Sequence, residues 1–313
     1  MSPLSPARPA RPTGFVVHDP EFASVLGPTP RLERAVATDA HEGPVYVPGE
    51  DALYFTTVPR RPTADADPLV AVKRLALDGQ RFPLEPDRVS LVRSDANGAN
   101  GMALDRDGAL VVCEQGTRSR PAAITRGGHT LVDAFEGRPL NSPNDVVVKS
   151  DRSIWFTDPS YGYRQGFRPE PAMGDHVYRY DPGSGRLTLV ADGFDKPNGL
   201  CFAPDERVLY VADNGGPHAL LAFDMREEAR IANRRVLHES TPAHPDGLKT
   251  DSAGRIYATC AGGVHVLAAS GRLIGEIELP GAVNLCFGGP GRNTLFITTD
   301  DAIWAAVLET RGP

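Results

Sequence analysis

The chain has 313 residues, 41% of them hydrophobic, which is enough apolar material for one large all-β domain or for two ordinary domains. The net charge of −7, with no Lys/Arg run interleaved with aromatic residues, excludes a protein that binds the nucleic-acid backbone. No apolar run reaches the roughly 18 residues that a membrane-spanning helix needs, so we expect neither nucleic acid nor a membrane as partner.

The N-terminal residues 1–14 contain four prolines and almost no apolar pattern, which predicts a disordered tail. This stretch lacks the apolar core of a secretory signal, so we expect a cytoplasmic protein in which residues 15–313 form a single domain. Four cysteines stand singly within apolar stretches without CxxC spacing, which predicts buried free thiols; they are Cys113, Cys201, Cys260 and Cys286.

A unit with a common pattern recurs six times along the chain. Each copy begins with a polar residue, continues as a short apolar strand and a turn rich in Asp, Gly, Pro or Ser, and ends in a strand of β-branched and aromatic residues. The copies are "EGPVYVPGEDALYFTT" from Glu42, "NGMALDRDGALVVCEQG" from Asn100, "NDVVVKSDRSIWFTDPS" from Asn144, "NGLCFAPDERVLYVADNG" from Asn198, "DGLKTDSAGRIYATCAGG" from Asp246 and "NLCFGGPGRNTLFITTD" from Asn284.

The register within the copies is tight, because the leading aliphatic residue of the second strand always follows the polar residue by ten or eleven positions. These residues are Leu53, Leu110, Ile154, Leu209, Ile256 and Leu295. The copies start 38 to 58 residues apart, about 48 on average, which is the period of a four-stranded propeller blade. We therefore predict an all-β fold, a six-bladed β-propeller whose closure removes exposed sheet edges.

The segments between the copies supply the outer strands of the predicted blades. Residues 175–194 and 263–281 each read as a strand pair, and "DPGSGRL" at 181–187 is expected to be a hairpin turn and no catalytic motif. A propeller usually closes when one terminus adds a strand to the blade of the other. "TGFVVHD" at 13–19 and "RLERAVATD" at 31–39 are the candidates for that strand.

The first polar residue of each copy is expected to point into the mouth of the central channel, because the innermost strand of each blade lines the channel. Crowded amides and carboxylates are costly to desolvate unless a partner such as a cation satisfies them. The set is Glu42, Asn100, Asn144, Asn198, Asp246 and Asn284. Its hard oxygen donors predict a central-channel metal site that favours Ca²⁺, with Mg²⁺ or Mn²⁺ as alternatives and Zn²⁺ less suited.

Such a site predicts hydrolysis of an ester or lactone. A divalent cation held by amides and two carboxylates can polarise a carbonyl or lower the pKa of a water molecule. A carboxylate beside the cation, for which Asp246 is the best candidate, can take the proton from the attacking water.

The motifs "EGPVYV", "NSPNDVVVKSDRSIWFTDPSYG", "KPNGLCFAPDERVLYVADN" and "HPDGLKTDSAGRIYATCAGGVHV" resemble the gluconolactonase, senescence marker protein and luciferin-regenerating enzyme family over roughly residues 30–310. The resemblance implies a six-bladed propeller that hydrolyses sugar lactones with a bound divalent cation, commonly calcium. It implies that Glu42, Asn198 and Asp246 bind the metal, that Asn144 is a further ligand or orients the substrate, and that Asp246 is the general base. It also implies that Asn100 and Asn284 need not be ligands.

The sequence departs from the resemblance at one point, where "TDAHEGP" places His41 beside the first expected ligand and leaves the pocket wall, and hence the substrate, undetermined. "VCEQGTRSR" is similar to the gluconolactonase-like branch, in which His often replaces Gln115. Glu114 and Arg118 are therefore expected to face substrate hydroxyls. Asn100 and Asn144, two of the six polar residues at the channel mouth, are expected to do the same.

Other polar residues are expected to be structural. Asp158 and Asp213 end inner strands and are interpreted as turn or supporting residues, His244 as a solvated loop histidine and Trp155 as strand packing.

Two other functions stay open: phosphotriester or aryl-ester hydrolysis at the same metal site, and a non-enzymatic binding scaffold. The expected partner is a small-molecule lactone, and the expected state is a monomer or weak homodimer.

Overall fold

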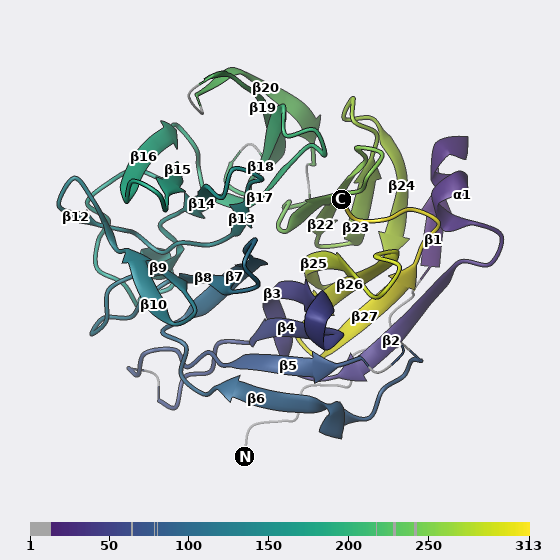
Figure 1. Ribbon diagram of the computed structural model, residues 1–313, viewed down its shortest axis with the longest axis horizontal. Helices are drawn as coiled ribbons and strands as arrows, with labels where there is room; N and C mark the ends of the chain where they lie inside the picture. The colour runs from purple at the N-terminus through teal and green to yellow at the C-terminus, as the bar shows by residue number, and fades with distance from the viewer. Residues whose placement is uncertain are drawn as a thin grey trace.

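The computed structural model describes residues 14–313 except 64, 78, 80, 217, 228, 229, 241 and 242. Six antiparallel sheets surround a central axis like the blades of a propeller (Figure 1), and β11 (Ala134–Phe135) and β12 (Arg138–Pro139) form a small extra ribbon. The predicted six-bladed β-propeller is confirmed. The predicted tail lies outside the described residues except for Gly14, where the first strand begins.

The blades follow one another along the chain, each with its innermost strand first. Blade 1 has β3 (Ala40–Val47), β4 (Ala52–Thr57), β5 (Val72–Ala76) and β6 (Val89–Arg93), and blade 2 has β7 (Ala99–Leu104), β8 (Leu110–Glu114), β9 (Ala123–Arg126) and β10 (His129–Val132). Blade 3 has β13 (Val146–Val148), β14 (Ile154–Asp158), β15 (His176–Asp181) and β16 (Arg186–Ala191), and blade 4 has β17 (Pro197–Phe202), β18 (Val208–Asp213), β19 (Ala219–Met225) and β20 (Ile231–Glu239). Blade 5 has β21 (Leu248–Thr250), β22 (Ile256–Cys260), β23 (Gly263–Leu267) and β24 (Leu273–Glu278), and blade 6 has β25 (Ala282–Gly288), β26 (Thr294–Thr299) and β27 (Ala302–Val307).

Both candidate N-terminal segments join the C-terminal blades. Strand β2 (Arg31–Ala37) pairs with β27 and completes blade 6, so the ring is closed by the N-terminal part of the chain. Strand β1 (Gly14–Val17) adds a fifth strand to blade 5 beside β24. The predicted outer pairs β15–β16 and β23–β24 and the hairpin turn at 181–187 are confirmed by their registers.

The helices are short. Helix α1 (Pro20–Leu26) starts at Asp19, whose Oδ1 accepts a hydrogen bond of 2.8 Å from the Glu21 backbone N–H, and it packs Phe22 onto blade 5 where Gly275 leaves room for the ring. Helix α2 (Tyr161–Arg164) and the 3₁₀ turns η1 (Pro48–Glu50) and η2 (Pro86–Arg88) lie in connections between strands. No helix in the described part of the chain is long and apolar enough to cross a membrane.

The apolar core lies between the blades. Each of six hydrophobic clusters joins two neighbouring blades, for example Trp155 and Val177 of blade 3 with Leu200 and Val211 of blade 4. Trp155 is fully buried there, as predicted, and its indole N–H donates to Ser153 Oγ at 2.9 Å. All four cysteines are buried and free, which confirms the prediction for them.

Glycine controls how closely the blades approach at the start of the inner strands. A Cβ on Gly199 would lie 2.2 Å from the Asp246 carbonyl oxygen of the next blade, and one on Gly101 would lie 2.6 Å from that of Asn144. The same glycines donate their backbone N–H groups to these carbonyls, at 3.0 Å and 2.8 Å. Gly43 and Gly247 make equally close contacts with the following blade. The glycine that follows the polar residue therefore allows backbone contact between blades and does not mark a turn.

Threonines of the second strands add a further link between blades. Thr157 Oγ1 donates to the Asn198 carbonyl at 2.8 Å, and Thr298 Oγ1 donates to that of His41 at 2.6 Å. Both side chains are fully buried, so each hydroxyl satisfies a carbonyl that water does not reach. These hydrogen bonds hold the residues of the channel mouth by their own backbone.

Replacing Gly199 with alanine tests the contact between blades 4 and 5. Since the new methyl group would overlap the Asp246 carbonyl, we expect Gly199→Ala to lower the free energy of unfolding by about 2 to 3 kcal/mol, as overpacking does elsewhere. Urea unfolding followed by circular dichroism measures this. Gly49→Ala is the matched control, because a Cβ there meets no atom within 4 Å. Equal stability of the two variants would contradict the close approach.

On the turns between first and second strands, Glu206 links blade 4 to blade 3. Its carboxylate lies 2.8 Å from Lys149 Nζ and accepts the Ser150 backbone N–H at 2.7 Å. Burial alone would raise the pKa of Glu206, but the hydrogen bonds from Lys149 and Ser150 outweigh it and leave the pKa below its usual value.

A depressed folded-state pKa stabilises the protein above the unfolded-state pKa of about 4.3, and this contribution is lost as the pH falls through the folded value. We therefore expect Glu206→Gln to reduce the free energy of unfolding by about 1 kcal/mol at pH 7, with a difference that shrinks below about pH 4. Urea unfolding across this range measures it, with exposed Glu170→Gln as control. A difference that is the same at pH 7 and pH 3 would contradict the assignment.

Candidate functional site

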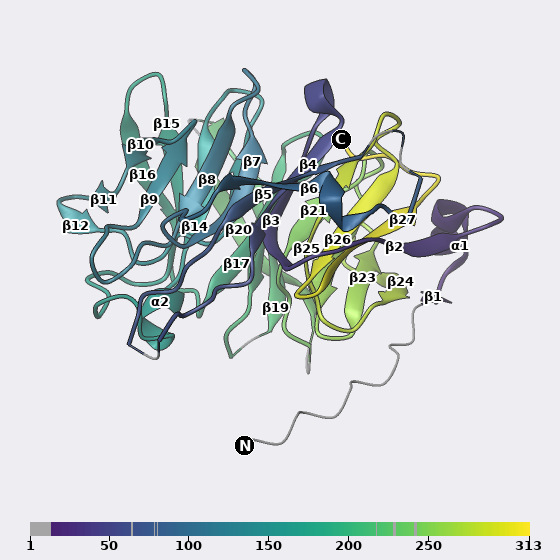
Figure 2. The same cartoon turned by 90° about the horizontal axis from the view of Figure 1, so that it is seen from below.

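The six polar residues predicted to form a ring come together at one mouth of the central channel, the end on which α2 lies (Figure 2). Four of them belong to inner strands, and Asn144 and Asp246 each precede their strand by two residues. Their backbones interlock through the glycine contacts, since Gly43 faces Asn100 and Gly247 faces Asn284. The structure therefore places these side chains in one layer, as the repeat predicts.

In this layer, Asn284 of blade 6 and Glu42 of blade 1 are hydrogen-bonded to each other. Asn284 Nδ2 donates to Glu42 Oε2 at 2.7 Å, and Asn284 Oδ1 accepts the Leu285 backbone N–H at 2.7 Å. Both polar ends of Asn284 are thus occupied, so its amide orients Glu42 and has no oxygen turned to the channel for a ligand.

Blades 2 to 5 contribute oxygens without a partner. Oδ1 atoms in the four consecutive blades are buried and accept no hydrogen bond within the described part of the chain; they belong to Asn100, Asn144, Asn198 and Asp246. An unsatisfied buried acceptor costs about 1 to 3 kcal/mol, and four in one layer need an explanation beyond folding. Carboxylate and amide oxygens are the donors that hard divalent cations prefer, so these residues fit such an ion.

The two carboxylates of the layer, Glu42 and Asp246, also favour a bound cation. Burial raises the pKa of Glu42, which the charge of His41 and the hydrogen bond from Asn284 counteract in part. Burial and then the charge of Glu42 raise the pKa of Asp246 well above its usual range. No Lys or Arg forms an ion pair with either carboxylate among the residues that the structure describes. The two carboxylates therefore share the mouth without a Lys or Arg partner among the described residues, and His41 is the one basic side chain that acts on both.

The donor set is mixed. No cluster of three or more His, Cys, Asp or Glu side chains suited to a metal occurs within the described residues. A cation at the mouth would therefore depend on amide oxygens together with the two carboxylates, and such a set favours calcium over zinc.

Asp145 stands where four other blades have glycine. It is 2% exposed, its Oδ1 accepts the Val146 backbone N–H at 2.9 Å, and its Oδ2 lies 3.8 Å from Lys249 Nζ. Burial raises its pKa, and the charge of Lys249 counteracts this in part. The repeat pattern predicts no role for this carboxylate, and the structure pairs it with a lysine on the inner strand of blade 5.

The connection between β14 and β15, residues 159–175, contains α2 and reaches the mouth. Tyr161 Oη accepts a hydrogen bond of 3.2 Å from Asn198 Nδ2, and burial followed by the charge of Asp246 raises the pKa of the phenol, which stays protonated. Sequence reasoning assigned Tyr161 no role, because a single contact between a loop and a ring residue leaves no periodic signal. Its only trace is the "YG" that directly follows the third copy.

Glu114 and Arg118 contact other protein groups. Glu114 is 5% exposed and binds Arg93 at 2.6 Å, Asn97 Nδ2 at 2.9 Å and Thr125 Oγ1 at 3.2 Å. Arg118 donates to the carbonyls of Asp65, at 2.9 Å, and Gly166. These contacts tie neighbouring loops together, and substrate contact by either residue stays a prediction.

The remaining polar residues take supporting positions. Asp158 accepts the backbone N–H groups of Asn141 and Ser142 at 2.9 Å and 2.8 Å, and burial raises its pKa to about 7. Asp213 accepts the backbone N–H of Asp195 at 3.1 Å.

Two histidines lie near the mouth, His41 in strand β3 and His244 in the connection between β20 and β21. His41 Nδ1 lies 2.8 Å from Asp300 Oδ1, beside Glu42. His244 is exposed, and the centroid of its ring lies 3.8 Å from the centroid of the His218 ring.

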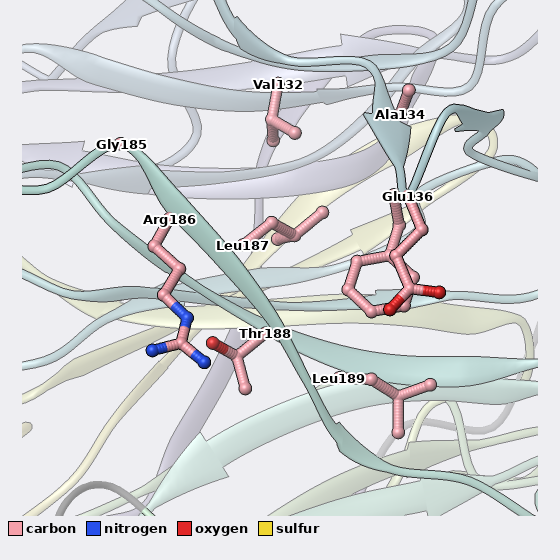
Figure 3. A pocket seen from close by; sticks show the side chains of 9 residues that line it. Val132, Ala134, Glu136, Gly185, Arg186, Leu187, Thr188 and Leu189 are labelled. Carbon is pink, nitrogen blue, oxygen red and sulfur yellow. The ribbon is translucent and has the colours of Figure 1, made fainter.

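A hollow of about 520 Å³ lies away from this site, at the rim between blades 2 and 3 (Figure 3). Its lining consists of Val132, Ala134, Phe135, Glu136, Gly185, Arg186, Leu187, Thr188 and Leu189. None of the mouth residues takes part, and the lining has one carboxylate, from Glu136, and one guanidinium, from Arg186. The unpartnered oxygens make the channel mouth the better candidate.

Comparisons with known proteins agree with this architecture. Residues 40–301 match the family model described as SMP-30/Gluconolactonase/LRE-like region. A gluconolactonase of Zymomonas mobilis is 29% identical, in an alignment that covers 94% of this chain and 85% of that protein. Pentonolactonase XacC of Haloferax volcanii is 28% identical over 82% of this chain and 80% of its own length. A solved gluconolactonase from Xanthomonas campestris superposes with a TM-score of 0.81 at 32% identity, covering 97% of this chain and 99% of that one.

Proposed function

This chain belongs to the SMP-30/gluconolactonase/LRE-like family and is a lactonase, and we propose that it opens sugar lactones to aldonic acids with a divalent cation held at the channel mouth. The observation that carries the proposal is the layer of four unpartnered oxygens, one of them from the Asp246 carboxylate, beside the buried carboxylate of Glu42. The gluconolactonase and pentonolactonase relatives support the substrate class.

Glu42, Asn144, Asn198 and Asp246 would hold the cation. Three of them have a buried oxygen without a hydrogen-bond partner, and the fourth, Glu42, is oriented by Asn284. The set contains oxygen donors only, so we propose Ca²⁺ as the preferred ion, with Mg²⁺, Mn²⁺ and Zn²⁺ as alternatives.

A bound divalent cation supplies a Lewis acid for the lactone carbonyl and lowers the pKa of water at the site. Asp246 is half-buried at the mouth, so its carboxylate can be reached by water and can accept the proton as that water attacks the carbonyl carbon. The ring C–O bond then breaks, and the departing alkoxide takes a proton to give the hydroxy acid. Acid is released at neutral pH because the product carboxyl group ionises.

Asn100 is the group best placed to contact substrate hydroxyls, and for Asn144 this contact is the alternative to holding the cation. Their amide oxygens are free, whereas the polar atoms of Glu114 are engaged by Arg93, Asn97 and Thr125. A buried amide that has no protein partner can discriminate between substrates, because a substrate lacking the matching hydroxyl leaves it unpaired.

Removal of the metal tests the proposal directly. We expect the chain to release acid from D-glucono-1,5-lactone faster than the spontaneous reaction, to lose this activity on chelation, and to regain it with Ca²⁺. Asp246→Asn keeps an oxygen donor but cannot accept the proton, so we expect kcat to fall by about 10² to 10⁴. Proton release in weakly buffered indicator solution measures both effects.

Asp205→Asn is the matched control and should keep full activity, because Asp205 lies on the turn between β17 and β18, at the end of blade 4 away from the channel mouth. Full activity of Asp246→Asn would remove the general-base role. Faster release from a phosphotriester than from any sugar lactone would favour the alternative esterase activity. Lack of any hydrolysis, with no cation bound, would leave a binding scaffold.

Replacing Asn144 with leucine separates the demands of folding from those of the cation. Since the Asn144 oxygen has no partner in the protein, we expect Asn144→Leu to unfold at the same or a slightly higher Tm than the unaltered chain in chelator. The rise in Tm that added Ca²⁺ gives the unaltered chain should become smaller or disappear. Thermal unfolding with and without Ca²⁺ measures both, and an undiminished calcium effect would exclude Asn144 as a ligand.

A further inference from the structure

The connection of residues 159–175, here called the mouth strap, is tied to three blades. Ser142 Oγ donates to the Pro159 carbonyl at 2.6 Å and accepts the Gly162 backbone N–H at 2.9 Å, which fixes the first turn of α2. Arg61, from the β4–β5 connection of blade 1, donates to the Gln165 carbonyl at 2.8 Å, and Arg118 of blade 2 donates to that of Gly166. The strap is therefore held at both ends of α2.

Arg168 anchors the rest of the strap. Its guanidinium donates only to backbone carbonyls, at 2.9 to 3.1 Å; they belong to Asn141, Thr117, Arg120 and Leu140. An arginine that spans several carbonyls of two neighbouring loops restricts their relative movement, because its planar fork loses several hydrogen bonds at once when it shifts. The strap thus presents α2 to the mouth in a defined position.

Tyr161 and Tyr163 of α2 have different surroundings. Tyr163 is 48% exposed and faces away from the core of the molecule. Tyr161 is half-buried, and its hydroxyl oxygen lies 3.2 Å from Asn198 Nδ2. The strap therefore places the phenol of Tyr161 against Asn198, one of the six polar residues at the channel mouth.

This contact makes the two ends of the Asn198 carboxamide different. The nitrogen end donates to the phenol and also interacts with the Asp246 carboxylate, and the oxygen end is buried without a hydrogen-bond partner among the described residues. A carboxamide free to rotate would exchange the two ends, and its N–H₂ group would repel a cation. Groups behind a metal ligand typically set the ligand's orientation.

Resting on the cation site proposed above, we propose that Tyr161 is the positioning residue for Asn198: its phenol oxygen holds the amide nitrogen and keeps the amide oxygen turned to the cation. The strap and its arginines serve this contact by holding α2 in place. Tyr161 then acts on the ion through Asn198, and its removal weakens ion binding without removing a ligand.

The test is calcium affinity, measured by isothermal titration calorimetry on protein freed of metal by a chelator. Tyr161→Phe keeps the ring and loses the hydroxyl, so we expect its Kd for Ca²⁺ to rise by about 10- to 100-fold, the range usual for such supporting groups. Tyr163→Phe on the same helix is the control and should leave the Kd unchanged. The Tm of Tyr161→Phe in chelator should equal that of the unaltered chain, which separates loss of affinity from loss of folding.

A double-mutant cycle assigns the effect to Asn198. In the Asn198→Ala background, Tyr161→Phe should cause no further loss of affinity, because the group it positions is gone. Normal calcium binding by Tyr161→Phe, or an undiminished effect in the Asn198→Ala background, would overturn the positioning role alone. An unaltered chain that binds none of Ca²⁺, Mg²⁺, Mn²⁺ and Zn²⁺ would overturn the cation site itself and this inference with it.

Discussion

The fold and the site both depend on how closely the inner strands of neighbouring blades approach at the channel mouth. Backbone meets backbone there, because glycine follows the polar residue in four blades and threonine hydroxyls bind carbonyls of the next blade. A larger side chain at these glycines would push the blades apart and widen the layer of oxygens. The Asn-Gly and Asp-Gly pairs therefore set the diameter of the site, and the six apolar clusters behind them keep the blades pressed together.

This closeness has an electrostatic consequence. Glu42 is buried and Asp246 is half-buried, burial raises the pKa of both, and four oxygens of the same layer lack partners among the described residues. A fold selected only for stability would replace such groups with apolar ones, and proteins retain them where function needs them. A cation at the mouth would satisfy the oxygens and neutralise the carboxylates together, so the proposed ion binding would also stabilise the fold.

The architecture could be predicted from the sequence because a blade is a local pattern repeated six times. The inner hairpins, two of the outer strand pairs and the N-terminal closing strand all lie at their predicted positions. The residues that meet at the mouth could be predicted for the same reason. Which of their oxygens stay free could not: both ends of Asn284 are bound, whereas the oxygen of Asn144 is not, and their local sequences do not distinguish them. That difference arises from contacts across the ring.

The connections that do not repeat carry the part of the site that the pattern could not predict. The mouth strap separates β14 from β15 by 17 residues, 159–175, whereas β22 and β23 are joined by a tight turn. It brings Tyr161 into hydrogen-bond contact with Asn198 in the neighbouring blade. On the opposite side of the ring, Glu42 has its hydrogen bond from Asn284. Repetition alone would make the six positions equivalent. The strap distinguishes Asn198 through Tyr161, and the hydrogen bond between Asn284 and Glu42 distinguishes blades 6 and 1 from blades 2 to 5, whose Oδ1 atoms have no partner among the described residues.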